Sequence, residues 1–219
     1  MSSGAEHWTT WEDLGASAEC IECPLKDDKF VNLPLYQEIP PDRPGGSSVP
    51  VVYIFGLNVP DRFANKTLES IGLRKRFNLN AVAVEMVQGK RKRLNLAICA
   101  QNEAMPPPGL GVTLWVGVQG GIGSLKQICE FLGELPQTLR ARWVPLRSFH
   151  IGRIPQWVGC DLVQNRIRAE SGVNVLGICL AGQADRVQMF PEPGHVLRAT
   201  DVLLVLRPDE ERLEAIAQR

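Results

Sequence analysis

Hydrophobic and polar positions alternate along two short segments of the chain, NAVAVEMV at 80–87 and VNVLGICL at 173–180. A period of two is typical of a strand that buries one face. Each segment is followed by a small polar stretch, QGKRKR at 88–93 and AGQAD at 181–185. Such stretches are typical of hairpin turns, so the pattern predicts that each strand folds back into another strand.

A stretch with helix-like spacing precedes each of these strands, at about 67–76 and about 161–170. The residue at the end of the stretch is Asn78 in the first case and Gly172 in the second. These two residue types tolerate the left-handed conformation that closes a helix. The sequence therefore predicts, twice, a short helix followed at once by a strand.

The two patterns belong to an internal repeat. Shifting the numbering by 94 positions places residues 65–84 on 159–178 without a gap, so that Leu68 meets Leu162 and Asn80 meets Asn174. The repeat continues downstream with other spacings. PPPG at 106–109 corresponds to PEPG at 191–194, VTLWVGV at 112–118 to DVLLVLR at 201–207, and SLKQICEFL at 124–132 to ERLEAIAQ at 211–218.

Each repeat predicts a β-α-β-β-β-α unit, with an opening strand near 51–56 or 147–151. A sheet covered by helices on one face needs a partner for its other apolar surface, and the second unit is the obvious partner. We therefore expect an α+β fold with two tandem units packed as a pseudo-two-fold pair and joined near 134–146. The predicted divisions are a leader at 1–48, a first domain at 49–135 and a second domain at 143–219.

The leader is rich in proline, ends in GGSS at 45–48, and shows little periodicity, which predicts an extended and partly ordered segment. Trp8 and Trp11 could each dock on a folded surface. Cys20 and Cys23 form a CxxC motif, but a second pair that would complete a zinc site is missing, so the motif does not favour a metal or redox function.

Composition excludes several functional classes. Lys+Arg and Asp+Glu both number 24, so no overall positive field favours nucleic acid, and any electrostatic site must be local. The longest apolar stretch, Leu110 to Val118, falls far short of the roughly 20 residues that cross a bilayer. The first 20 residues show no secretory signal. These features predict a cytoplasmic protein that does not insert into the membrane by itself.

Two segments carry a family resemblance: KTLESIGLRKRFNLNAVAV at 66–84 and, more clearly, GVNVLGICLAGQADRVQMFPEPGHVLRATDVLLVLRPDEERLEAI at 172–216. They resemble the C-terminal ligand-binding domain of RCK/TrkA potassium-transport regulators, here in two tandem copies. The second unit departs from the family pattern at Ala199 and Thr200 and keeps only Asp201 of the usual Gly-Asp. The family's nucleotide-binding Rossmann half has no counterpart, because GVQGGIG at 117–123 has the wrong glycine spacing.

Proteins of this family bind small ligands, notably cyclic di-adenylate, between two such domains. The resemblance implies contacts from an Arg at the helix end, an Asn six positions later, and a proline after the hairpin. The implied ligand-binding residues are Arg74, Asn80, Arg168, Asn174, Val175, Pro191 and Pro193. Some members carry a His just before the Asn, where this chain has Leu79 and Val173. No metal or cofactor is implied.

The same residues allow simpler explanations. Each Asn could cap the preceding helix turn, and each Arg could be a solvated cation at a helix end. The basic run at 89–93 could bind phosphate or nucleic acid, but it lacks interleaved aromatics, so a charged hairpin tip is favoured. His195 lies in the PEPGH turn, where a surface position is expected. No catalytic arrangement of residues stands out, so an enzyme is not expected.

The resemblance thus implies a cytoplasmic regulatory module of a potassium or cation transport system that senses a small ligand. Its partner would be a membrane transporter or channel subunit, through which it would associate with the membrane, and the chain could also form a homodimer. The alternative is a structural module that has lost ligand binding and docks a protein, with the leader's tryptophans taking part.

Overall fold

The computed structural model describes residues 8–16, 21–26, 29–30, 36–39, 49–88, 91–96, 104–105, 111–118, 123–162, 167, 174–180, 187–192, 194–206 and 216–218. The chain divides into two compact units. The first contains Met1–Leu35 and Tyr53–Val144, and the second contains Tyr36–Val52 and Pro145–Arg219.

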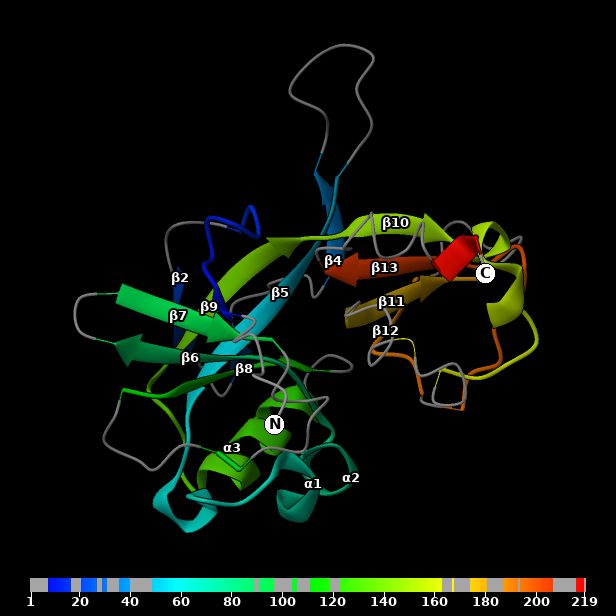
Figure 1. Ribbon diagram of the computed structural model, residues 1–219. Coiled ribbons are helices and arrows are strands. Elements are labelled where there is room, and N and C mark those ends of the chain that lie inside the picture. Colours follow the sequence, from blue (N-terminus) through cyan, green and yellow to red (C-terminus); the bar gives the residue numbers. More distant parts are fainter. Residues whose placement is uncertain are drawn as a thin grey trace. The chain divides into compact units, whose positions relative to one another are not determined.

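A curled antiparallel sheet forms the first unit, with the strand order β1-β7-β6-β8-β5-β9-β2-β3 (Figure 1). The strands are β1 (Trp8–Thr9), β2 (Ile21–Lys26), β3 (Lys29–Phe30), β5 (Val49–Asn58), β6 (Leu79–Gln88), β7 (Arg91–Asn95), β8 (Thr113–Val118) and β9 (Thr138–Pro145). The predicted hairpin is confirmed, because β6 pairs with β7 from Val84–Asn95 to Gln88–Arg91. In β5, only Tyr53–Asn58 belongs to this unit.

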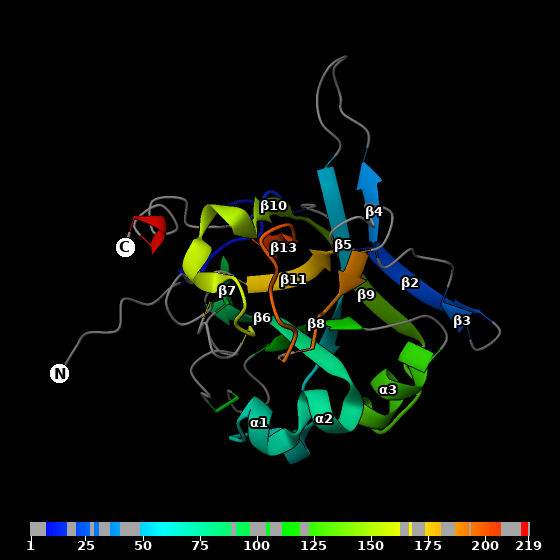
Figure 2. The same ribbon diagram turned by 90° about the vertical axis from the view of Figure 1, so that its right-hand side faces the viewer.

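Helices cover one face of this sheet, as Figure 2 shows for α1 (Leu68–Ile71), α2 (Leu73–Phe77) and α3 (Gly123–Leu132). A 3-10 turn, η1 (Asp61–Phe63), precedes them. Asn78 ends α2 in the left-handed conformation with φ 51°, which confirms the predicted boundary. Gly72, also left-handed at φ 70°, divides the single predicted helix into α1 and α2, because its amide already bonds back to Leu68 and Glu69.

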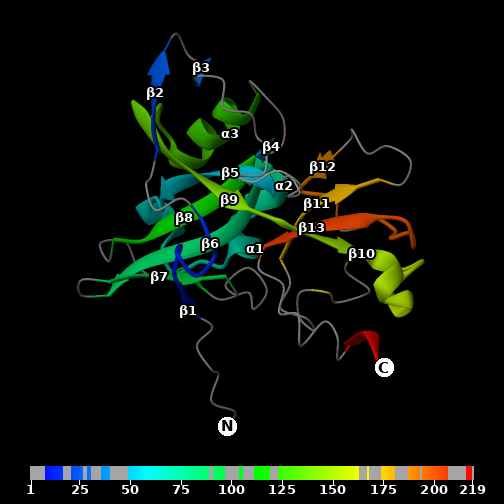
Figure 3. The ribbon, with the colours of Figure 1, turned by 90° about the horizontal axis from the view of Figure 1, so that it is seen from above.

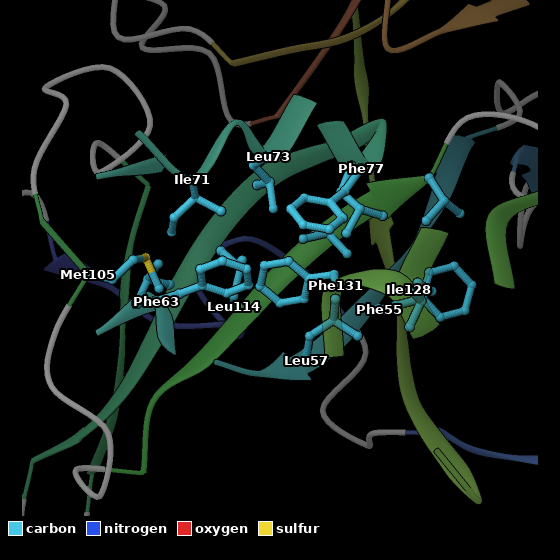
Figure 4. Packing of buried hydrophobic residues seen from close by; sticks show 14 of the residues in the cluster. Phe55, Leu57, Phe63, Ile71, Leu73, Phe77, Met105, Leu114, Ile128 and Phe131 are labelled. Atoms are coloured by element: carbon cyan, nitrogen blue, oxygen red, sulfur yellow. The ribbon is translucent and has the colours of Figure 1, made fainter. Parts of the chain in front are cut away.

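The helices and the sheet enclose an apolar core (Figure 4). Three phenylalanines lie at its centre, one from each of η1, α2 and α3. The ring of Phe131 stacks on Phe63 with centroids 5.1 Å apart and meets Phe77 edge-on at 5.5 Å. The strands contribute buried residues to this core, namely Phe55 and Leu57 of β5, Leu79 and Val84 of β6 on either side of its register irregularity, Leu114, Val116 and Val118 of β8, and Leu139 and Ala141 of β9.

The second unit contains a four-stranded antiparallel sheet in the order β10-β13-β11-β12. Its strands are β10 (Arg147–His150), β11 (Asn174–Cys179), β12 (Val187–Met189) and β13 (Val202–Leu206). Strand β10 is followed by two 3-10 turns, which are η2 (Ile151–Arg153) and η3 (Pro155–Trp157). β4 (Tyr36–Ile39) also belongs to this unit and pairs with Val49–Val52. The core contains Ile151, Ile154, Trp157, Ile167, Ile178, Leu197, Leu203, Val205 and Ile216.

The two units repeat one strand topology. Replacing β5, β6, β7 and β8 by β10, β11, β12 and β13 converts the order β5-β8-β6-β7 into β10-β13-β11-β12. A register irregularity lies between Ala81 and Ala83 where β6 pairs with β8, and another lies between Val175 and Gly177 where β11 pairs with β13. These positions coincide under the shift of 94. The internal repeat predicted from the sequence therefore appears in strand order and in a local backbone defect.

Two features of the sheet were not predicted. The described parts of the leader are extended except for the turn at 11–15, and the extended parts form β1 to β4, which pair with other strands. The joint predicted near 134–146 contains β9, whose partners include β2, from Ile21–Ala141 to Pro24–Thr138. Pairing of this kind uses backbone groups, so it leaves little trace in side-chain periodicity. No helix in the described part of the chain is long and apolar enough to cross a membrane.

Candidate functional site

The two predicted asparagines occupy the same place in the two units. Asn80 lies opposite Gly117 and Asn174 lies opposite Leu206, and each directly precedes the register irregularity. Asn174 is buried, at 7% exposure. The Nδ2 atom of Asn80 is buried and has no hydrogen-bond partner among the described residues. An unpaired buried amide is costly, so this donor lacks a partner that the described residues could supply.

Arg74 and Asn80 lie on different sides of the sheet in the first unit. Arg74 is part of α2, whose Leu73 and Phe77 pack in the core. Leu79 and Ala81 also pack in that core, so the intervening Asn80 points to the opposite face. The spacing of six therefore does not bring the two side chains to one face of this unit.

The remaining predicted residues belong to the second unit. Val175 is half-buried and packs against its hydrophobic core. Pro191 is buried directly after Phe190, which has a φ of 51° and whose amide donates to the Leu176 carbonyl at 2.7 Å. Arg168 and Pro193 lie outside the described residues.

His195 corrects the sequence prediction of a surface residue, because its side chain is only 21% exposed. Its Nε2 atom lies 3.6 Å from Oδ2 of Asp201, which is 1% exposed. The same carboxylate oxygen accepts a hydrogen bond from the Arg198 amide at 2.9 Å. Asp201 is therefore a buried carboxylate that closes the 198–201 turn.

Sequence reasoning missed a buried polar group in the first unit. The indole Nε1–H of Trp11 donates to Oε2 of Glu85 at 2.6 Å, and Oε1 of Glu85 lies 3.4 Å from the Lys92 ammonium. The guanidinium carbon of Arg142 lies 4.9 Å from the centre of the Trp11 ring and 5.4 Å from that of Trp115. The two indoles meet edge-on at 5.1 Å.

We call Glu85, Trp115 and Arg142 the tryptophan site. All three lie on the face that points away from α1, α2 and α3, since they alternate with Val84, Leu114 and Ala141 of the helix-side core. Glu85 is 1% exposed and Arg142 is 4% exposed. The available sequence signal was a single carboxylate within the apolar alternating segment 80–87, since an ionised group is rarely buried without a partner.

The basic run at 89–93 is only partly a hairpin tip. Arg91, Lys92 and Arg93 are strand residues of β7, and Gly89 and Lys90 lie outside the described residues. Lys92 forms the ion pair with Glu85. One charge of the run therefore neutralises a buried carboxylate of the same protein.

No group of three or more His, Cys, Asp or Glu side chains within the described ranges is arranged to hold a metal ion.

Comparison with known proteins adds little. No protein-family model matches the chain. No curated protein matches it either. Among solved structures, the chain is similar to one titled "GsuK Channel", with 10% sequence identity and a TM-score of 0.33 over 84% of this chain. The chain spans 55% of the length of that one. A likeness at this TM-score carries no argument about fold or function.

Proposed function

We propose that the protein is a ligand-sensing regulatory module of a potassium or cation transport system, and that it acts on a membrane transporter or channel subunit from the cytoplasmic side. The proposed ligand is a small anion with a nucleobase, such as cyclic di-adenylate. The observation that carries the proposal is the repeated asparagine, Asn80 and Asn174, at one position of a repeated topology. The resemblance of residues 172–216 to the RCK C-terminal domain supplies the ligand class.

The chemistry of these residues supports this ligand. An Asn amide offers both a donor and an acceptor to the edge of an adenine, and the buried Nδ2 of Asn80 lacks a partner in the described part of the chain. Arg168 precedes Asn174 by six positions in the sequence, and a guanidinium binds phosphate in a forked geometry. Ligand binding would shift the population towards the conformation that the transporter recognises, and no catalytic step is involved.

The experiment is isothermal titration calorimetry of the full chain with cyclic di-adenylate, mononucleotides and divalent cations, together with thermal shifts. Binding of one compound should raise the Tm through linkage. Asn174→Ala and Arg168→Ala should each weaken binding about tenfold or more, because each removes a bond to a polar or charged group. Gln137→Ala is the matched control, since it removes an exposed amide.

Two results would contradict the proposal. One is that no compound of the panel binds. The other is binding that Asn80→Ala, Asn174→Ala and Arg168→Ala leave as strong as the Gln137→Ala control does.

A further inference from the structure

The short helices α1 and α2 carry a dense group of basic residues. Between residues 66 and 76 the chain has four Lys or Arg side chains and one acidic side chain, Glu69. In a chain whose charges balance overall, this segment has a local excess of positive charge. We call its four cations the basic face, which consists of Lys66, Arg74, Lys75 and Arg76.

Packing in the core directs these cations to the surface. Leu73 and Phe77 lie four positions apart on α2, and both pack against the helix-side face of the sheet. The three residues between them therefore lie on the outer side of the helix, at successive steps of about 100°. Lys75 and Arg76 are exposed and Arg74 is half-buried, while Lys66, just before α1, is also exposed. The cations thus spread over a surface and do not converge on one point.

The elements beside α1 and α2 add little net charge. Lys126 of α3 lies 3.9 Å from the Glu130 carboxylate, so this pair is neutral. Arg62 of η1 follows Asp61 and donates to carbonyls at the end of α3. Glu134, beyond α3, is exposed and acidic. The positive excess therefore belongs to α1 and α2.

The composition of this surface indicates the class of its partner. The large exposed hydrophobic side chains of the described residues are Val49, Val87, Leu135, Val158 and Val196, and all of them lie outside 66–76. A protein partner is usually held by apolar and aromatic groups at the centre of its interface. Phe63 and Phe77 are buried, so they cannot stack on the bases of a single-stranded nucleic acid. An anionic lipid surface requires only the charges, and clusters of roughly four to eight Lys or Arg on a helical surface are typical of proteins that bind it.

The other face of the same unit carries negative charge. Residues 1–25 contain five acidic residues and no Lys or Arg. Two of these acids, Glu12 and Asp13, are exposed on the turn whose Trp11 docks at the tryptophan site, on the face that points away from the helices. This turn follows β1, which pairs with β7 at one edge of the sheet (Figure 3). The first unit therefore has a positive side and a negative side, and an anionic surface attracts the first and repels the second.

We propose that the basic face is a docking surface for the anionic phospholipid headgroups of a membrane. Binding is electrostatic and involves no insertion, and it holds the acidic turn away from the membrane. Each cation close to such a surface contributes about fivefold to the affinity. The inference goes beyond the proposed function, which places the chain beside a membrane transporter, and it does not rest on the proposed ligand.

The test is co-sedimentation of the full chain with vesicles of phosphatidylcholine that contain phosphatidylserine, with pure phosphatidylcholine vesicles as the reference. The vesicles hold neither transporter nor cyclic di-adenylate, so the result is separate from that of the ligand titration. We expect binding to the serine-containing vesicles only, weakened at least about tenfold when the salt concentration rises from about 0.05 to 0.5 M. Binding to neither vesicle, equal binding to both, or tighter binding to a DNA duplex at the same salt concentration overturns the proposal.

Two double variants locate the binding surface. Lys66→Gln with Lys75→Gln removes two exposed cations of the basic face, and glutamine keeps the helix propensity of lysine. We expect this variant to bind the serine-containing vesicles at least about tenfold more weakly. Arg153→Gln with Arg198→Gln is the matched control, since it removes the same charge from exposed positions of the second unit. Equal weakening by the two double variants overturns the proposal.

A second measurement on the unaltered protein covers the case in which a variant fails to fold. Acetylation rates of individual lysines are measured by mass spectrometry with and without the serine-containing vesicles. Lys92 is the internal reference, because its side chain is 57% exposed and pairs with Glu85 on the face away from the helices. The vesicles should slow acetylation of Lys66 and Lys75 and leave Lys92 unchanged. Equal slowing of all three lysines, or slowing of Lys92 alone, overturns the proposal.

Discussion

Ala81 of β6 and Val175 of β11 mark the same backbone irregularity in the two units, 94 positions apart in the sequence. In both strands the next paired residue is two positions further on, Ala83 in the first unit and Gly177 in the second. A bulge changes the twist of its strand and is therefore a structural feature of the unit. Its recurrence indicates that the two units share one backbone plan, although their side chains differ.

Gly177, at the end of this bulge, lies against two side chains, and we predict that Gly177→Ala destabilises the protein. A Cβ atom at this position would lie 2.9 Å from Sδ of Met189 and 3.2 Å from Cδ1 of Leu204. We expect a loss of about 1–2 kcal/mol in the free energy of unfolding, measured by urea denaturation. Met189→Ala in the same chain should recover part of this loss, because it removes the clashing atom. Gly194→Ala, where a Cβ would meet nothing within 4 Å, is the control; equal losses at the two glycines would contradict this account.

Arg62 caps the end of α3, and we predict that its removal destabilises the protein. Its guanidinium donates to the carbonyls of Phe131 at 2.5 Å and Glu130 at 3.2 Å. We expect Arg62→Ala to lower the free energy of unfolding by about 1–2 kcal/mol, since it leaves these carbonyls unpaired and removes a cation from the negative end of the helix. Lys126→Ala, which removes an exposed ion pair on the same helix, should change it by less than about 0.5 kcal/mol. A larger loss in the control would contradict the assignment.

The contact between Trp11 and Glu85 predicts energetic coupling. Trp11→Phe keeps a ring without its donor, and Glu85→Gln keeps an acceptor without its charge. The quantity to measure is the opening free energy of the Ala16 amide, which donates to the Trp11 carbonyl, by hydrogen exchange in the four members of the cycle. We expect a coupling of about 1–3 kcal/mol, typical of a hydrogen bond to a charged group. Additive effects would show that the 2.6 Å contact contributes no specific energy.

The environment of Tyr36 predicts that the stability of the folded protein decreases at alkaline pH. Burial, and after it the charge and hydrogen bond of Glu38, raise the pKa of Tyr36 from 10.0 to about 12. The folded protein therefore holds this proton more tightly than the unfolded chain. The resulting stability is complete below pH 10.0 and is lost as the pH rises towards about 12. Ultraviolet titration, with Tyr36→Phe as the reference, should show a lower Tyr36 pKa in Glu38→Gln; an unchanged value would exclude Glu38 as a cause.

Much of the first unit could be predicted from side-chain pattern. The alternation at 80–87 placed β6, and Asn78 marked the end of α2, because both signals are local. β9 and the strands of the leader could not be found this way. Their pairing uses backbone groups, and a segment such as Ile21–Lys26 carries a proline and little alternation.

The sites show the same division. The repeat correctly placed Asn80 and Asn174 at equivalent positions, since both lie on strands with strong alternation. The spacing of Arg74 and Asn80 did not predict that the sheet separates them. Trp11, Glu85 and Arg142 are far apart in the chain, and their contact depends on how the sheet orders its strands. A single sequence contains no signal for that order.

The most direct test of the proposed function follows the side-chain amides of Asn80 and Asn174 by NMR during titration of the full chain with cyclic di-adenylate. The account predicts that both amide signals shift with one common Kd, while the exposed amide of Gln137 stays in place. If neither asparagine signal moves at a ligand concentration that saturates any binding seen by calorimetry, the two asparagines are structural and the proposed sensor function is contradicted.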